Sequence, residues 1–302
     1  AAITLGGSNL SVSFHETLID AQLGGASIPN PSTYQSINPV SQVIYVRVIN
    51  TGATDCPSIT SFTLRVNPFP EIPSSLAPYA LCDSNNPGDG IEVFDLSTRV
   101  GEILNGLDPT LHTVSFHLTE TQANLGQGAL TGISSYSSST TQIWVRVTIT
   151  ATGCYKLVPL NLVVNALPIA NLPTPLTLCD SNNPGDEREE FDLSLAISEI
   201  VGSQQGLEVS FHLTQNQALS GASPLGFLYT NTVNVQTLHV RVFDPSTGCF
   251  SVTTLDLRVL PLPSVLVPLT PYTLCDDNND GLAGFDLSSL ETGLLNGSST
   301  TV

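Results

Sequence analysis

The sequence predicts an all-β fold: tandem immunoglobulin-like β-sandwich modules of about 97 residues, each with a short helical insert, in an elongated array. Three observations support this prediction. One acidic motif recurs at nearly constant spacing, apolar and polar residues alternate over short runs, and proline-rich segments separate the runs. Alternation with a period of two places every second side chain on one face, which indicates half-buried strands.

The recurring motif begins at a cysteine and occurs three times. Cys82 to Leu96 reads Cys-Asp-Ser-Asn-Asn-Pro-Gly-Asp-Gly-Ile-Glu-Val-Phe-Asp-Leu, Cys179 to Leu193 repeats most of it, and Cys275 to Leu287 is two residues shorter. The three cysteines lie 97 and 96 residues apart, so the chain is a tandem repeat and is expected to be part of a longer array. Together with the proline-rich joints, this spacing predicts a partial module at 1–69, full modules at 70–167 and 168–263, and the start of a further module at 264–302.

The second module shows the expected order of elements within one period. Residues 95–106 combine an Asp/Ser cap, apolar residues at helical spacing and a terminal glycine, which predicts a short helix. Residues 114–118 alternate as a strand, and residues 119–123 predict a further helical turn. No element is assigned to the Ser/Gly-rich stretch that follows. Two antiparallel strands, at 143–148 and 160–164, then close the module.

Composition limits the classes of function. The chain has 8 basic and 26 acidic residues, a net charge of −18 and a pI near 4.2. This charge argues against binding of nucleic acid and against docking on an anionic lipid surface, because both need basic residues. No apolar run approaches the ~20 residues of a membrane-spanning helix, so we expect no insertion into a membrane. Apolar residues make up 41% of the chain, enough to bury a core and to disfavour disorder.

The acidic motifs predict calcium sites. In the third copy the spacing Asp-x-Asn-x-Asp-Gly is the one that wraps oxygen ligands around Ca²⁺, but the glutamate that completes an EF-hand is absent. The alternative is a turn held by Asx hydrogen bonds, which needs no metal. The candidate ligands are Asp83, Asn85, Asp89 and Asp95 in the first copy, Asp180, Asn182, Asp186 and Asp192 in the second, and Asp276, Asn278, Asp280 and Asp286 in the third.

Six cysteines predict three disulfides and an extracellular location, because disulfides persist outside the reducing cytoplasm. Pairing each cysteine with the next uses all six in loops of similar length: Cys56–Cys82, Cys154–Cys179 and Cys249–Cys275. The alternative, Cys82–Cys154 with Cys179–Cys249, encloses longer loops and leaves two cysteines unpaired. The short loops are the preferred prediction. The absence of close Cys-x-x-Cys pairs disfavours zinc.

Two further repeat positions carry polar side chains. Strand alternation is expected to place one histidine per module on a solvated face, opposite a buried phenylalanine (His15, His117 and His212). One arginine per module is expected to point outward and to pair with acidic neighbours (Arg47, Arg146 and Arg241). No Ser/His/Asp set, phosphate loop or paired-carboxylate motif stands out, so the chain is predicted not to be an enzyme.

The motif Cys-Asp-x-Asn-Asn-(Pro-Gly)-Asp-Gly…Phe-Asp-Leu, followed by Val-Ser-Phe-His, Val-Arg-Val and Thr-Gly-Cys, resembles repeats of very large Bacteroidetes surface adhesins. Proteins of that family are exported by the type IX secretion system, and some are SprB-like gliding adhesins. The resemblance implies an extracellular, cell-surface fibre of disulfide-bonded repeats that serves adhesion or gliding motility. Neighbouring repeats of the same chain, surface polysaccharide and other cell-surface proteins are the partners that it implies.

Two other functions remain open from the sequence. The modules could be carbohydrate-binding or spacer modules of a secreted enzyme, which predicts an exposed aromatic cluster that differs between modules. The chain could instead be a subunit of a self-assembling surface filament, which predicts pairing between chains at residues 1–15 and 290–302.

Overall fold

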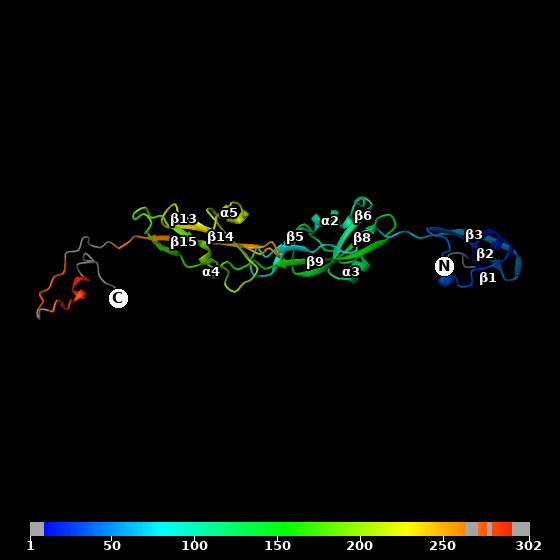
Figure 1. Ribbon diagram of the computed structural model, residues 1–302. Coiled ribbons are helices and arrows are strands. Elements are labelled where there is room, and N and C mark those ends of the chain that lie inside the picture. Colours follow the sequence, from blue (N-terminus) through cyan, green and yellow to red (C-terminus); the bar gives the residue numbers. More distant parts are fainter. Residues whose placement is uncertain (1–8, 264–270, 277–279, 292–302) are drawn as a thin grey trace. The chain divides into compact units, whose positions relative to one another are not determined.

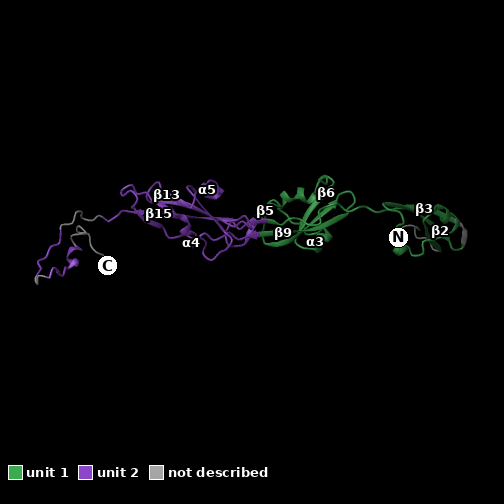
Figure 2. Ribbon diagram, in the orientation of Figure 1, with its two compact units in different colours: residues 1–79, 93–163 green, residues 80–92, 164–302 purple. Residues whose placement is uncertain are grey.

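The computed structural model describes residues 9–263, 271–276 and 280–291 (Figure 1). Short strands joined by turns and short helices make up the chain, as the sequence predicts for an all-β protein. Two compact units can be distinguished, one of residues 1–79 and 93–163 and one of residues 80–92 and 164–302 (Figure 2). Residues 82–92 of the first acidic motif therefore belong to the same unit as the third module.

The first module contains one antiparallel sheet in the order β1-β2-β3. Its strands pair so that Phe14 lies opposite Val46, and Ile44 opposite Phe62. The elements are β1 (Leu10–His15), α1 (Leu18–Leu23), η1 (Pro31–Thr33), β2 (Ser41–Asn50) and β3 (Ala53–Arg65).

The second module contains a four-stranded sheet in the order β4-β9-β8-β6 and a two-stranded sheet of β5 and β7. Its closing strands pair with Ile143 opposite Leu160, as their alternation predicts. The elements are β4 (Tyr79–Cys82), β5 (Ile91–Phe94), η2 (Leu96–Arg99), α2 (Val100–Leu104), β6 (His112–His117), α3 (Glu120–Leu125), β7 (Tyr136–Ser139), β8 (Thr141–Ile149) and β9 (Tyr155–Asn165).

The third module repeats this arrangement, with sheets β10-β15-β14-β12 and β11-β13. Its elements are β10 (Leu176–Cys179), β11 (Glu190–Asp192), η3 (Leu193–Ala196), α4 (Ile197–Val201), β12 (Glu208–His212), α5 (Gln215–Ser220), β13 (Leu228–Thr230), β14 (Gln236–Phe243) and β15 (Phe250–Leu260). In the described part of residues 264–302, η4 (Leu287–Leu290) occupies the position that corresponds to η3.

The strand order is that of an immunoglobulin-like sandwich. The antiparallel neighbours β12, β14 and β15 match strands C, F and G of one sheet, and β11 and β13 match strands B and E of the other. The first strand, β10, adds to the outer edge of β15 in parallel orientation, with Leu176 opposite Leu257 and Cys179 opposite Leu260. Short helices lie in the connections between these strands, with η3 and α4 between β11 and β12 and α5 between β12 and β13, which confirms the predicted sandwich with a helical insert.

Local sequence explains where the short helices begin and end. In α3, the hydroxyl of Thr119 accepts a hydrogen bond from the Gln122 backbone N–H at 3.2 Å, as an N-cap does. The helix stops at Gly126, whose φ of 64° is accessible to glycine at little cost. The corresponding helices α1 and α5 have the same threonine cap and glycine stop.

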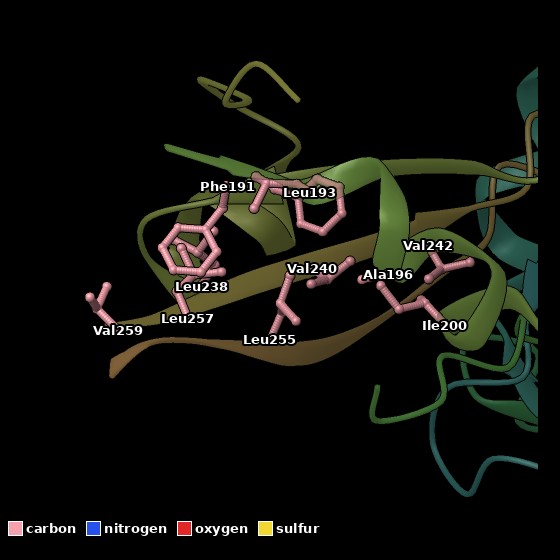
Figure 3. Close-up of a cluster of buried hydrophobic side chains, with 11 residues drawn as sticks. Phe191, Leu193, Ala196, Ile200, Leu238, Val240, Val242, Leu255, Leu257 and Val259 are labelled. Carbon is pink, nitrogen blue, oxygen red and sulfur yellow. The ribbon is translucent and has the colours of Figure 1, made fainter. Parts of the chain in front are cut away.

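The core of the third module lies between its two layers (Figure 3). Phe191 and Leu193, from β11 and η3, are at most 1% exposed and face the strand residues Leu238 and Leu257. Ile200 of α4 closes the core on the side of Val242. The segment that runs from β11 to α4 therefore supplies one side of the core. Burial of each such side chain contributes about 1.5–3 kcal/mol to stability.

Candidate functional site

A disulfide joins Cys82, at the end of β4, to Cys249, which directly precedes β15. The two Cα atoms lie 5.6 Å apart, and 167 residues separate the cysteines in the sequence. Both residues belong to the second compact unit. The bond therefore connects the acidic motif of the second module to the last strand of the third.

This pairing corrects the prediction of short loops. Because Cys82 and Cys249 bond to each other, the expected pairs Cys56–Cys82 and Cys249–Cys275 cannot form. The expected pair Cys154–Cys179 is not formed either, because both residues carry free thiols, as does Cys275. The side chain of Cys56 lies outside the described part of the structure.

Strand geometry also excludes the alternative pair Cys179–Cys249. Cys179 lies opposite Leu260 at the far end of β15, whereas Cys249 stands before the first residue of that strand. Eleven strand residues span about 36 Å at 3.3 Å per residue, but a disulfide needs Cα atoms within about 7 Å. A module cannot close this bond on itself, so the cysteine before β15 pairs with a neighbouring module.

The acidic loop beside the disulfide is held together by two buried carboxylates. Glu92, which is 4% exposed, accepts hydrogen bonds from the backbone N–H groups of Ser84 and Asn85 and from the Asn85 side chain. Asp83, which is 3% exposed, accepts from the backbone N–H groups of Gly88 and Gly90 through Oδ2. The loop is thus wrapped around its own carboxylates.

The third module repeats this loop. Glu189 accepts from the backbone N–H of Asn182 at 2.9 Å and from that of Ser181, and these bonds lower the pKa of its carboxyl. Asp180 Oδ2 accepts from the Gly185 N–H at 2.6 Å. Within the described part of the chain, Oδ1 of Asp83 and Oδ1 of Asp180 are buried without a hydrogen-bond partner.

The other predicted calcium ligands have separate roles. Asp89 accepts from the Asn86 side chain and the Ile91 backbone, and Asp186 accepts from Asn183 and Arg188 in the same way, so the pKa of each aspartate is lowered. Amides of two predicted ligands bind the buried glutamates (Asn85 and Asn182). Three aspartates lie outside the loops and cap 3₁₀ helices (Asp95, Asp192 and Asp286).

The third acidic motif is described only in part. Asp276 accepts from the backbone N–H groups of Asp280 and Gly281, and Asn278 lies outside the described residues. Among the described residues, no three His, Cys, Asp or Glu side chains meet in an arrangement that could hold a metal ion. Glu92 and Glu189 have no counterpart in this motif, where Ala283 stands at the corresponding position.

The loop of residues 83–92 borders the third module. Asp83, Pro87 and Gly88 line a cavity of about 440 Å³ together with the joint at 166–170 and Ser251 and Val252 of β15. The Asp83 N–H also donates to the carbonyl of Asn165 at 2.8 Å, at the end of β9. The acidic loop therefore contacts both the joint and the strand that its disulfide reaches.

The histidines are buried, contrary to the expectation of a solvated face. Their exposed fractions are at most 1%, because the short helix after each strand covers the face opposite the core (His15, His117 and His212). In the second module, Nδ1 of His117 lies 2.9 Å from the carbonyl of Gln127 and Nε2 lies 2.9 Å from the hydroxyl of Ser115. Since a carbonyl only accepts, Nδ1 carries the hydrogen and Nε2 accepts from the serine.

The arginine that recurs once in each module also has a role other than the expected one. Arg146 donates from Nη1 to the carbonyls of Ala123 and Asn124 at 2.8 and 2.9 Å, and its guanidinium lies 3.4 Å from the ring centre of Tyr155. Arg241 contacts α5 and Phe250 in the same way. These arginines satisfy helix C-terminal carbonyls and do not serve as partners of acidic side chains.

Comparison with known families agrees with the disulfide. Residues 1–70, 78–168 and 175–263 each match the family described as the Flavobacterium inter-domain disulphide bond domain. The chain belongs to this family. Cys82 lies in the second matched domain and Cys249 in the third, so the bond links two disulphide bond domains. The match supports the resemblance to a Bacteroidetes extracellular repeat protein.

Two solved structures of consecutive domains are similar at low identity. Titin domains I67–I69 are 9% identical with a TM-score of 0.29, covering 84% of this chain and 89% of that one. Domains 3–5 of Drosophila OTK are 6% identical with a TM-score of 0.30, covering 86% and 88%. The immunoglobulin-like topology rests on the strand order described above. Comparison with curated proteins found no match.

The structure has no helix, among its described residues, that is long and apolar enough to span a membrane. Disulfides are formed and kept in oxidising environments, so the bond between these domains supports an extracellular location.

Proposed function

We propose that this chain is a load-bearing segment of an extracellular fibre, and that its inter-domain disulfide limits how far the fibre stretches. The observation that carries the proposal is the bond between Cys82 and Cys249. Tension that reaches Cys82 passes through the sulfur atoms directly to Cys249. Residues 83–248 are thereby removed from the loaded path, whether or not they are folded.

The shortened path has a measurable size. A fully extended chain spans about 3.3–3.6 Å per residue, so the 167-residue separation hides about 550–600 Å of extension. Single-molecule stretching of the full chain, held at both ends, measures this length. The maximum extension is expected to increase by that amount when the disulfide is reduced. Cys154→Ser, which removes a free thiol, is the matched control and is expected to stretch as the unmodified chain does.

The load-bearing function would be refuted if oxidised and reduced chains reached the same maximum extension. The proposal is of a structural and not a catalytic protein, supported by tandem immunoglobulin-like domains and the bond between them. The proposal also includes a role in adhesion or gliding motility, export by the type IX system and attachment at the cell surface. These parts are supported by the resemblance to adhesin repeats. Surface polysaccharide or another surface protein is the partner that such a fibre would reach.

We also propose that Ca²⁺ stiffens the acidic loops. The supporting observation is the buried, unpartnered Oδ1 of Asp83 and of Asp180, found at the same position in two loops among the described residues. A carboxylate oxygen in this state gains by contacting a cation. Asn85 and Asp89, with their counterparts in the other loops, would supply further oxygens, at an affinity of roughly 10⁻⁴–10⁻³ M.

Millimolar Ca²⁺ is expected to raise the melting temperature and to slow proteolysis at residues 82–95, 179–192 and 275–286. Asp89→Asn should weaken both effects, whereas Asp108→Asn, in a turn outside the loops, should leave them unchanged. If chelation changes neither quantity in the unmodified chain, the loops are turns without a metal.

A further inference from the structure

The two cysteines of the inter-domain disulfide differ in their access to solvent. Cys249 is 0% exposed, and its carbonyl accepts a hydrogen bond from the Asp244 N–H at 2.8 Å, which closes the turn before β15. Cys82, at the end of β4, is only half-buried. A thiolate has to contact a sulfur atom in order to break a disulfide. In the folded unit, Cys82 is therefore the cysteine that an external thiol can reach.

The site of attack decides which product forms. A thiolate RS⁻ that attacks Sγ of Cys82 forms the mixed disulfide Cys82–S–S–R, and the electron pair of the broken bond passes to the sulfur of Cys249. That sulfur takes up the proton that the small thiol released, so the exchange consumes one thiol and needs no other oxidant or reductant. Attack at Cys249 would give the opposite product, and burial of Cys249 prevents it.

A cavity gives a small thiol room beside the bond. The cavity of about 440 Å³ is lined by Asp83, which directly follows Cys82, and by Ser251 and Val252, which follow Cys249 after one residue. Its other lining residues are mostly apolar and come from Pro87, Gly88 and the joint at 166–170. A short aliphatic thiol fits these surroundings, because its methylene groups contact apolar side chains while its sulfur approaches Cys82.

The segments that the bond joins carry mainly negative charge. Asp83, Asp89 and Glu92 belong to residues 80–92, a segment without a basic residue. On the side of Cys249, residues 244–249 contain Asp244 and again no basic residue. The guanidinium of Arg241 is engaged in hydrogen bonds to two carbonyls of α5. A negatively charged thiol is therefore repelled as it approaches, whereas an ammonium group on the thiol reduces the repulsion.

We propose that Cys82 is a site of reversible modification by small thiols, and that the acidic loop selects cationic thiols over anionic ones. Cysteamine, which carries an ammonium group, represents the preferred class. 3-Mercaptopropionate, which carries a carboxylate, represents the disfavoured class. The proposal does not depend on the load-bearing function.

The modification is reversible because Cys249 stays in place. Its strand, β15, pairs with β14 over residues 250–257 and with β10 over residues 257–260, and neither pairing involves the disulfide. On the other side, the Asp83 N–H holds the start of the acidic loop to the carbonyl of Asn165. The thiol of Cys249 thus remains beside the modified Cys82, attacks the mixed disulfide and expels the small thiol. The bond stays open only while the small thiol is in excess.

The test of the site uses the complete chain with its free thiols first alkylated, in the presence of a chelator. Cysteamine is added for short times, the reaction is stopped with acid, and peptide mapping is expected to find cysteamine on Cys82 and a free thiol on Cys249. In concentrated urea both cysteines should be labelled, because unfolding exposes Cys249. Equal labelling in the folded chain, or no labelling of Cys82, would overturn the site. Removal of cysteamine should restore the bond, and an adduct that persists would overturn its reversibility.

The selection by charge is tested with rates expressed per thiolate. At low ionic strength, cysteamine is expected to react about five- to tenfold faster than 3-mercaptopropionate. The difference should shrink in 1 M salt, where the Debye length falls to about 3 Å. Asp89→Asn should also reduce it. Asp256→Asn is the matched control, because Asp256 lies about 23 Å from Cys249 along β15 at 3.3 Å per residue. Equal rates of the two thiols, or equal effects of the two variants, would overturn the selection.

Discussion

Replacing both Cys82 and Cys249 by serine tests how much the inter-domain bond stabilises the third module. Closing a loop of 167 residues reduces the entropy of the unfolded chain by an amount worth about 5 kcal/mol. If the second module stays folded, Asp83 is held beside Asn165 by a 2.8 Å hydrogen bond, and only about 84 residues remain in the loop. The loss is then about 4.5 kcal/mol, so the prediction hardly depends on which modules unfold together.

Hydrogen exchange in β14 and β15 measures the free energy of unfolding of the third module directly. It is needed because Trp144, the single tryptophan of the chain, lies in β8 and reports on the second module. The double variant should lose about 4–5 kcal/mol of protection, a large share of the 5–15 kcal/mol typical of a folded domain. Cys154→Ser should lose none. A loss below about 1 kcal/mol would show that the unfolded chain is not constrained by this bond.

Two further predictions concern residues of the third module. Arg241→Ala removes two hydrogen bonds to the C-terminal carbonyls of α5, so we expect the free energy of unfolding to fall by about 1.5–3 kcal/mol. Faster hydrogen exchange in α5 measures this loss, and replacement of the exposed Arg258 by alanine is the control. The lowered pKa of Glu189 means that its stabilising effect is complete above the unfolded pKa near 4.3 and is lost as the pH falls through the lower folded pKa. Proteolysis at residues 180–192 should therefore rise in acid, and Glu189→Gln, but not Glu190→Gln, should flatten this pH dependence; an unchanged profile would contradict it.

The strands with clear alternation were predictable from the sequence, and those without it were not. Residues 143–148 and 160–164 became β8 and β9 because their apolar side chains face one core. The four-residue β4 and β5 flank the acidic loop and are too short to show a period. Their positions depend on pairing with distant strands, which local sequence does not specify.

The buried histidines show why strand alternation misled. Phe116 and His117 are adjacent in β6 and point to opposite faces, yet both are buried. Alternation predicts one solvated face only where nothing covers it, and here α3 covers the second face. The Ser-x-His spacing was the signal in the sequence that could have indicated a buried histidine. A serine two residues before the histidine lies on the same side of the strand and can donate a hydrogen bond to the imidazole ring.

The predicted disulfides were wrong because pairing all six cysteines in loops of similar length takes no account of strand direction. Loop-closure entropy changes slowly with length, so short and long loops differ by little, whereas the direction of β10 along β15 decides which cysteines can meet. Parallel pairing of β10 with β15 places Cys179 at the end of the third module that adjoins the next joint. The cysteine before the last strand lies at the opposite end. Buried Glu92 was missed for a similar reason, since its partners are backbone groups rather than a recognisable motif.

The parallel pairing of β10 with β15 decides which cysteines of neighbouring repeats can meet. Cys82 lies at the end of the second repeat that adjoins the following joint, and Cys249 lies at the end of the third repeat that adjoins the preceding joint. The bond encloses the joint at 166–175, and Cys179 occupies in the third repeat the position that Cys82 occupies in the second. Because the disulfide crosses this joint beside the backbone, separation of the two repeats at the joint is limited by the sulfur atoms, which is the property that the stretching experiment measures.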